Sequence, residues 1–354
     1  MTSVRSLDTI QTHGYMRRIN LQTDLAQLAD LIELVFASTM DSSGRAALRE
    51  MRAMSRFGAG LRMLSHFNDV TAGVHLGFVW MIGERLVGNV SIYPANYPET
   101  LGKTWIVANV GVHPDFQGQG IARELMSACL SLIQERGGKR AILQVDADNH
   151  VAIHLYQSLG FVAERTWTQW KRHAGRLQQP LPTYTDSVFG ALTTQHPFDN
   201  ELSANNEVYI RHPRRSEWRD EWELAQALRA NGGLGWLRPL HPSLFKRPIW
   251  RMWSEWLNFR ATEHLIIRSD DDQSLIASAW IETSLTNTNK LTLLISPHDH
   301  ARSINALLKT IIRRFGNTSL SLEHPTDDTL TNTWLTQYQF MAKRAVINMS
   351  WEIG

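Results

Sequence analysis

The residues best suited to chemistry are a glycine-rich turn, Gln117-Gly118-Gln119-Gly120, and a tyrosine further along the chain, Tyr156. The turn follows a predicted strand that stops at Pro114 and precedes a predicted helix, so several backbone N–H groups without intrahelical partners meet at one point. These groups and the positive end of the helix dipole attract anions. Gly118 and Gly120 permit positive φ angles and close approach of a phosphate. The turn predicts a diphosphate site, although the same residues also suit a tight turn without a ligand.

A second chemical segment begins at Asn149, which starts another predicted helix. Tyr156 lies two turns later on the same helical face, so its phenol can point toward the strand that carries the glycine-rich turn. Cys129, in contrast, has Leu125 and Ile133 at helical spacing, and we expect a buried thiol rather than a nucleophile.

The elements that must position these residues alternate between strand and helix. The spacing of apolar residues and turn signals predicts strands near 15–19, 105–112, 141–145 and 161–170, a hairpin over 77–94, and helices over 23–36, 45–67, 117–136 and 148–159. Thr23 is the expected N-cap of the first helix. This order predicts a mixed α/β sheet.

The pattern repeats in the second half of the chain, where Tyr209-Ile210-Arg211 matches Tyr15-Met16-Arg17. A repeat near 180 residues indicates a duplicated domain. We therefore expect a first domain over 1–172, a linker over 173–206 and a second domain over 207–354. The tryptophans concentrated between 218 and 256 suit core packing, with an aromatic substrate cage as the alternative.

With these motifs in place, the sequence resembles the GNAT superfamily of acetyl-CoA-dependent N-acyltransferases. Gly118, Gly120 and Ala122 take the small-residue places of that family's Q/R-x-x-G-x-G/A loop. The resemblance covers residues 15–172, and the segment 146–161 is most similar to the ribosomal-protein N-terminal acetyltransferase branch. It implies two tandem GNAT domains.

The resemblance also implies how acetyl-CoA is held. Backbone amides of the turn bind the pyrophosphate, and a bulge near Val110–Val112 separates two parallel strands so that pantetheine inserts between them. Asn149 contacts the pantetheine arm, and Tyr156 lies near the sulfur as general acid. The implied cofactor-binding residues are Val110, Val112, Gln117, Gly118, Gln119, Gly120, Ile121, Ala122, Asn149 and Tyr156.

The general base is less well defined. An alkylammonium with a pKa of about 10 is roughly a thousandth neutral at pH 7, so the acceptor amine needs a base or a desolvating pocket. The branch named above uses a Glu where this chain has Gln144. Asp146, on the same face, is the first substitute, with capping of the next helix as its alternative role. Asn109 and Glu84 are candidates for positioning water or substrate, so the candidate catalytic residues are Tyr156, Asp146 and Asn109.

The second half lacks the corresponding chemistry. Aligning Pro297 on Pro114 replaces the residues of the turn, and aligning Phe340 on Phe161 replaces the phenol; the residues found there are Ala301, Arg302, Ser303, Asp328 and Leu335. Added Cβ atoms disfavour positive φ and crowd a diphosphate. We expect a degenerate second copy beside a first domain that is an N-acetyltransferase for a primary amine of a small molecule or a protein N-terminus. A non-catalytic acyl-CoA sensor or scaffold is the alternative.

Composition excludes several other classes. Lys and Arg outnumber Asp and Glu by only two, 36 against 34, and they are scattered, which argues against a nucleic-acid partner. No run approaches the roughly 18 apolar residues of a membrane span. His150 and His154 lack a third ligand nearby, so no metal is expected. The single cysteine suits a reducing cytoplasm, where we expect a monomer or homodimer with acetyl-CoA and an amine as partners.

Overall fold

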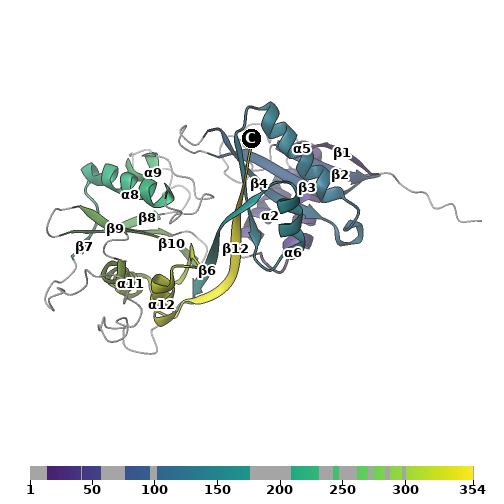
Figure 1. Cartoon of the computed structure of the whole chain (residues 1–354). Coiled ribbons are helices and arrows are strands. Elements are labelled where there is room, and N and C mark those ends of the chain that lie inside the picture. Colours follow the sequence, from purple (N-terminus) through teal and green to yellow (C-terminus); the bar gives the residue numbers. More distant parts are fainter. Residues whose placement is uncertain are drawn as a thin grey trace, which may run out of the picture. The chain divides into compact units, whose positions relative to one another are not determined.

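The computed structural model describes residues 14–40, 42–56, 76–95, 102–175, 209–230, 242–246, 261–269, 274–283, 288–296 and 300–353. They form two compact units (Figure 1). The first unit contains residues 1–143, 155–161 and 350–354, and the second contains 144–154 and 162–349. The predicted linker, 173–206, lies outside the described residues from residue 176 onward.

The first unit is built on a mixed sheet. Its strands are β1 (Tyr15–Arg18), β2 (Leu76–Ile82), β3 (Arg85–Pro94), β4 (Thr104–Val112) and the first residues of β5 (Arg140–Asp146). Neighbours from β1 to β4 are antiparallel, whereas β4 and β5 are parallel. The predicted hairpin turn is confirmed, with Gly83 at φ +57° between β2 and β3. The mixed α/β sheet is therefore the architecture that the sequence predicts.

Helices cover both faces of this sheet. The helices α1 (Leu21–Phe36) and α2 (Ser42–Ser55) share a buried cluster with Val79 and Met81 of β2. On the opposite face, Gly88 of β3 lies against α5 (Ile121–Glu135), where a Cβ on this glycine would come within 2.9 Å of Ile121 Cγ2. The glycine therefore allows the helix that follows the turn to pack closely on the sheet.

Two predicted helix starts in the first half are wrong. The N-cap of α1 is Asn20, whose side chain accepts from the Gln22 N–H at 3.0 Å, rather than Thr23. The helix predicted over 117–136 begins only at Ile121, after the 3-10 turn Pro114–Phe116, because glycines with left-handed backbone precede it. The helix predicted over 45–67 is α2 as far as Ser55, and residues 57–75 lie outside the described residues.

The second unit repeats this order. Its strands are β7 (Ile210–Arg211), β8 (Ala261–Arg268), β9 (Leu275–Thr283), β10 (Thr288–Ile295) and β11 (Ser319–Pro325), and its helices are α8 (Trp218–Ala230), α9 (Pro242–Lys246), α11 (His300–Phe315) and α12 (Thr329–Gln337), after the 3-10 turn Arg215–Glu217. Strands β7 to β10 are antiparallel neighbours, and β10 and β11 are parallel. The same sequence of antiparallel and parallel pairs as in the first unit confirms that the fold is duplicated.

A matching ion pair marks the start of each copy. Arg17 contacts both carboxylate oxygens of the buried Asp24 at 2.7 Å in the first unit. Arg211 contacts both carboxylate oxygens of Glu217 at 2.8 and 2.6 Å in the second. In each copy an arginine of the first strand thus binds a carboxylate in the helical segment that follows it, the first turn of α1 for Asp24 and the 3-10 turn before α8 for Glu217.

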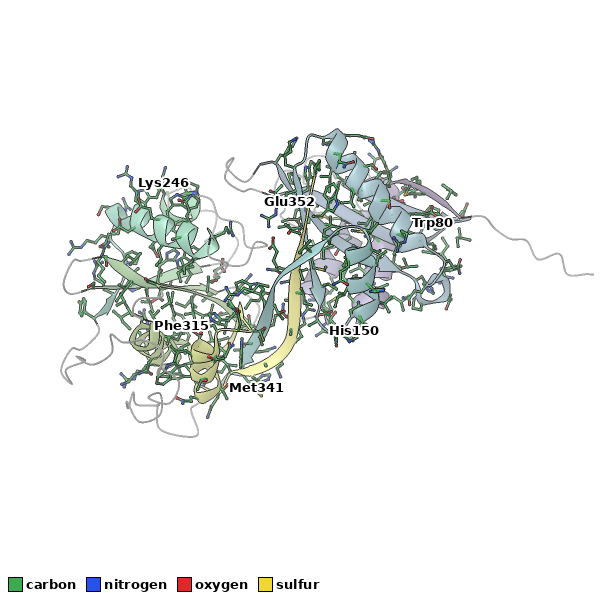
Figure 2. The ribbon with its side chains drawn as sticks, in the orientation of Figure 1. Trp80, His150, Lys246, Phe315, Met341 and Glu352 are labelled. Atoms are coloured by element: carbon green, nitrogen blue, oxygen red, sulfur yellow. The ribbon has the colours of Figure 1, made fainter. Side chains whose placement is uncertain are left out.

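The two copies exchange their final strands. Strand β6 (Val162–Arg172) belongs to the second unit, where it pairs antiparallel with β11 from Leu320↔Arg172 to Pro325↔Trp167. The end of β12 (Met341–Glu352) belongs to the first unit, where the Ile353 N–H donates to the Lys139 carbonyl and Glu352 (labelled in Figure 2) lies 3.6 Å from Arg140. The second unit therefore includes a strand from the first half of the sequence, and the first unit includes the last residues of the chain, from Ser350 onward.

Candidate functional site

The glycine-rich turn has the backbone that a phosphate site requires. Gly118 and Gly120 have φ angles of +75° and +82°, and Gly120 is the N-cap of α5. A Cβ at either position would meet no heavy atom within 4 Å, so the left-handed backbone, and not crowding by the protein, calls for glycine. The N–H groups of residues 118–120 have no hydrogen-bond partner within the part of the chain that the structure describes. The turn therefore presents free donors at the positive end of α5.

The remaining residues of the predicted loop support this turn. The Gln117 side chain donates to the carbonyl of Val112 at 3.0 Å and so fastens the turn to the end of β4. Gln119 is exposed, whereas Ile121 is buried at the first position of α5 and Ala122 follows it half-buried. The exposed part of the loop is therefore accessible to a ligand, while Gln117 and Ile121 hold its two ends in place.

A β-bulge interrupts β4 just before the turn. Pairing with β3 passes from Asn89↔Gly111 to Ser91↔Ala108, so Asn109 and Val110 stand opposite a single β3 residue. Asn109 has a φ of +54°, a left-handed conformation that Asn tolerates better than most residues. The bulge lies at Asn109–Val110, one residue before the predicted Val110–Val112, because Asn109 rather than Val112 carries the positive φ.

Strands β4 and β5 part beside the bulge. Their parallel pairing runs from Thr104↔Arg140 to Ile106↔Ile142 and ends before Val107 and Leu143, within the first unit. Backbone groups beyond the end of the ladder lack strand partners and can bind an extended ligand. The β4–β5 ladder thus ends before the bulge, and the insertion of a pantetheine arm there stays a prediction.

Tyr156 belongs to the first unit and is almost fully enclosed. Its side chain is 6% exposed, and its ring centroid lies 5.9 Å from that of Phe161. Burial raises the pKa of its phenol to about 12. No hydrogen bond joins its hydroxyl to another described residue. The phenol is therefore protonated at neutral pH and has its donor capacity unused.

Helix α6 (His150–Ser158), which carries Tyr156, is also tied to the helix after the turn. Arg123 in the first turn of α5 donates to Ser158 Oγ at 2.9 Å. Sequence reasoning missed Arg123, because an exposed arginine two residues into a helix has no distinguishing local pattern. The contact links the loop helix to the chain just after Tyr156.

Asn149 and Asp146 both lie in the second unit, and each has a contact that the sequence did not predict. Asn149 Oδ1 accepts from the Ala152 N–H at 3.1 Å and so caps α6. Asp146 does not provide this cap, so that alternative role is wrong. Its carboxylate Oδ1 lies 3.4 Å from Arg344 Nε of β12. The expected contact of Asn149 with pantetheine stays a prediction.

Gln144, where the ribosomal-protein branch has a Glu, is hydrogen-bonded to the C-terminal strand. Its Nε2 donates to Oδ1 of Asn348 at 3.2 Å, and Asn348 is 5% exposed. Asn348 and Arg344 were missed by sequence reasoning, since no local signal shows that a residue 204 positions away lies beside Gln144. Two side chains of β12 therefore contact the two β5 residues, Gln144 and Asp146, that were considered for the base.

Other candidates receive less support. Glu84 is exposed at the β2–β3 turn, where its main-chain carbonyl accepts from Gln27. Cys129 is fully buried, and burial raises the pKa of its thiol. Among the described residues no group of three His, Cys, Asp or Glu is placed to hold a metal ion. None of the described helices has the length and apolar content needed to cross a membrane.

The second unit differs from the first at the positions of the turn, the bulge and the phenol. Helix α11 begins at His300, so helical backbone occupies residues 301–303, which align with the turn residues 118–120. Pairing of β9 with β10 runs from Lys290↔Glu282 to Ile295↔Ala277 without a shift, and no bulge interrupts β10. Leu335 is buried where the alignment places Tyr156, and Asp328 caps α12 as Asn149 caps α6. The second copy keeps the cap and loses the turn, the bulge and the phenol.

Comparison with known proteins agrees with this geometry. Residues 47–161 match the Acetyltransferase (GNAT) family. Mycothiol acetyltransferase of Saccharomonospora viridis is 35% identical over 126 residues, which are 35% of this chain and 37% of that protein. Mycothiol acetyltransferase of Streptomyces scabiei is 39% identical over 95 residues, 27% and 29% of the two chains. The chain thus matches little more than a third of the length of either relative. Neither relative is named as a ribosomal-protein acetyltransferase, so the resemblance to that branch stays a prediction.

Solved structures match over nearly the whole chain. A tandem GNAT protein from the clavulanic acid biosynthesis pathway has a TM-score of 0.55 and 12% identity and covers 97% of this chain and 99% of that one. A GCN5-related N-acetyltransferase from Sphaerobacter thermophilus has a TM-score of 0.60 and 14% identity, covering 96% and 95%. At such identities the likeness shows the fold alone. The chain has the tandem GNAT fold that the sequence predicts.

Proposed function

We propose that this protein is an acetyl-CoA-dependent N-acetyltransferase that acts on a primary amine through the first of its two GNAT copies. The observation that carries the proposal is the first unit's combination of a left-handed glycine turn with a bulged, parting pair of parallel strands. The turn supplies donors for a diphosphate, and the unpaired strand edge supplies donors for an extended amide-containing arm. The family match over this segment supports acetyl-CoA as the ligand.

The candidate binding residues of the first unit then have defined roles in holding acetyl-CoA. The N–H groups of 118–120 and the start of α5 at Ile121 and Ala122 bind the pyrophosphate. Backbone groups of Val110 and Val112 contact pantetheine, and a bulge N–H stabilises the oxyanion that forms when the amine attacks the thioester carbonyl. The new C–N bond forms as the C–S bond breaks, and the amine loses one proton while the leaving thiolate gains one.

Tyr156 stabilises the leaving thiolate. An alkyl thiol has a pKa of about 8.5, well below the value of about 12 that burial gives this phenol. Complete transfer of the phenolic proton to the thiolate is therefore uphill. We infer that Tyr156 acts chiefly as a hydrogen-bond donor to the sulfur while the C–S bond breaks, a role for which its unused hydroxyl is available.

Asp146 is the proposed base, acting on the acceptor amine directly or through a water molecule. Gln144 cannot accept a proton, and its amide is engaged by Asn348. The Asp146 carboxylate lies beside the Arg344 guanidinium, which fixes its position. Asn109 contributes through its backbone in the bulge.

Calorimetric titration with acetyl-CoA, followed by measurement of thiol release, tests the function. The amine panel includes small primary amines, a peptide N-terminus and a mycothiol-type acceptor, which the names of the relatives suggest. Wild type should bind acetyl-CoA and release thiol with at least one amine. Absence of acetyl-CoA binding would contradict the proposal.

A non-catalytic acyl-CoA sensor is the second candidate, and the Gln144–Asn348 amide pair favours it. In this pair a neutral amide, Gln144, occupies the position where the resembled branch has a carboxylate that acts as the base. A sensor would bind acetyl-CoA tightly and release no thiol with any amine on the panel. The intact Tyr156 phenol favours the enzyme.

A further inference from the structure

Asn89 of β3 pairs with Gly111 of β4 and so lies directly beside the β4 bulge. Its side chain is 1% exposed, on the face of the sheet that α1 and α2 cover. Its Nδ2 donates to the main-chain carbonyl of Asn109 at 3.0 Å and lies 3.5 Å from Ser91 Oγ. The side chain therefore bonds to the one β4 residue whose backbone is left-handed.

The bulge explains why such a bond is needed. An inserted residue disrupts the strand ladder, so the Asn109 carbonyl lacks a regular partner on β3. A left-handed conformation at a residue other than glycine costs roughly 1 kcal/mol or more, and it persists only where surrounding contacts hold it. The Asn89 amide supplies such a contact. The reversed amide would set Oδ1 against the Asn109 carbonyl oxygen, so the orientation with Nδ2 toward the carbonyl is the one that bonds.

The same side chain carries a cost. Asn89 Oδ1 is buried and has no hydrogen-bond partner among the described residues. A buried unsatisfied acceptor typically costs about 1–3 kcal/mol. An apolar side chain would avoid that cost but would also leave the Asn109 carbonyl without its donor.

We propose that Asn89 is a positioning residue that holds the β4 bulge in the geometry that receives the pantetheine arm of acetyl-CoA. This inference rests on the proposed function. By fixing the Asn109 carbonyl, the amide fixes the peptide plane that follows and therefore the direction of the Val110 N–H. A hydrogen-bond donor whose direction is fixed before the ligand binds loses no free energy to reorganisation on binding. The glycine turn has its own contacts with β4 through Gln117 and does not depend on Asn89.

The test compares Asn89→Ala with Ser91→Ala by calorimetric titration with two probes, acetyl-CoA and ADP. ADP carries a diphosphate but no pantetheine. Ser91 is a matched control because it is fully buried on the same strand and face, two residues away. Asn89→Ala should weaken acetyl-CoA binding about tenfold, the effect of one lost hydrogen bond of ordinary strength, and leave ADP binding within twofold of wild type. Ser91→Ala should leave both affinities within twofold.

Thermal unfolding separates positioning from simple loss of structure. If Asn89→Ala does not fold, Asn89→Ser is used, with the same selective loss expected. Equal weakening of acetyl-CoA and ADP, or unchanged acetyl-CoA binding in a folded Asn89 variant, would overturn the inference. Failure of the wild type to bind acetyl-CoA would instead refute the proposed function itself, so the two failures are distinguishable.

Discussion

At the scale of single residues, Tyr156 combines deep burial with a hydroxyl that no described residue engages. Burial disfavours the phenolate, so the group stays neutral far above the pH at which an exposed phenol ionises. The hydroxyl oxygen is not one of the buried polar atoms without a partner, and no described residue bonds to it, so removing it should break no contact within the described residues. This combination separates the chemical role of Tyr156 from a structural one.

Tyr156→Phe should therefore lower kcat by about 100-fold while leaving the melting temperature within a few degrees of wild type. The measurement pairs thiol-release kinetics with thermal unfolding. Equal kcat for Tyr156→Phe and wild type would remove Tyr156 from the mechanism.

The pH profile gives a second test of the phenol. As pH rises from 6 to 10, more of the acceptor amine is neutral, and the rate should rise. The phenol has a pKa of about 12 in the folded protein, so it stays protonated over this range and causes no alkaline decline. A fall in kcat between pH 8 and 10 without unfolding would show that the donor has a much lower pKa than burial gives Tyr156.

Asp146 and Gln144 allow the base to be identified by rescue. Asp146→Asn should lower kcat about 100-fold, because a neutral amide cannot accept the proton. Adding Gln144→Glu to that variant should restore at least a tenth of the activity, since it places a carboxylate two residues away on the same face of β5. Asp146→Asn also removes the partner of Arg344, so thermal unfolding is the control. Unchanged kcat in a folded Asp146→Asn variant would exclude Asp146 as the base.

At the scale of elements, the regular strands and helices follow closely from the sequence, whereas their ends do not. Strands β4 and β5 and helices α5 and α6 all lie within a few residues of their predicted positions, because apolar spacing reports which face is buried. The start of α5 was predicted too early because the turn was counted with the helix, although the positive φ angles of Gly118 and Gly120 prevent the helix from starting before Ile121. A bulge was predicted near Val110–Val112 only through the family resemblance, because one extra residue in an apolar strand leaves no clear periodicity, and it lies at Asn109–Val110.

The turn before α5 provides the prediction at this scale. Gly120→Ala adds a methyl group that meets open space, so its cost is the left-handed backbone, about 1 kcal/mol or more. Acetyl-CoA binding should weaken at least fivefold as the turn relaxes. Ser303→Ala, at the aligned helical position of α11, should leave acetyl-CoA binding unchanged. Alanine is chosen for this control because Ser303 is fully buried, where a charged side chain would disturb the fold. Equal losses in both variants, measured by calorimetry, would show that the second copy takes part in cofactor binding.

At the scale of the whole molecule, the exchange of β6 and β12 makes the halves interdependent. Comparing the two halves of the sequence predicts two copies but not the exchange. β6 and β12 are equivalent final strands, and nothing in the sequence of either shows that it belongs with the other half of the chain. The exchange brings Arg344 and Asn348 to the face of β5, so a copy without its own cofactor turn still contributes side chains beside the candidate base.

Residues 1–175 expressed alone should therefore fail to give an active monomer. Without the end of β12, the first unit loses the contacts of Lys139 and Arg140 with Ile353 and Glu352, and β6 loses its pairing with β11. Unpaired strand edges favour aggregation or strand exchange between chains. Co-expression with residues 207–354 should restore a one-to-one complex with wild-type affinity for acetyl-CoA, measured by light scattering and calorimetry. A stable, active monomer of residues 1–175 would show that β6 can close its own sheet and that the exchange is not required for function.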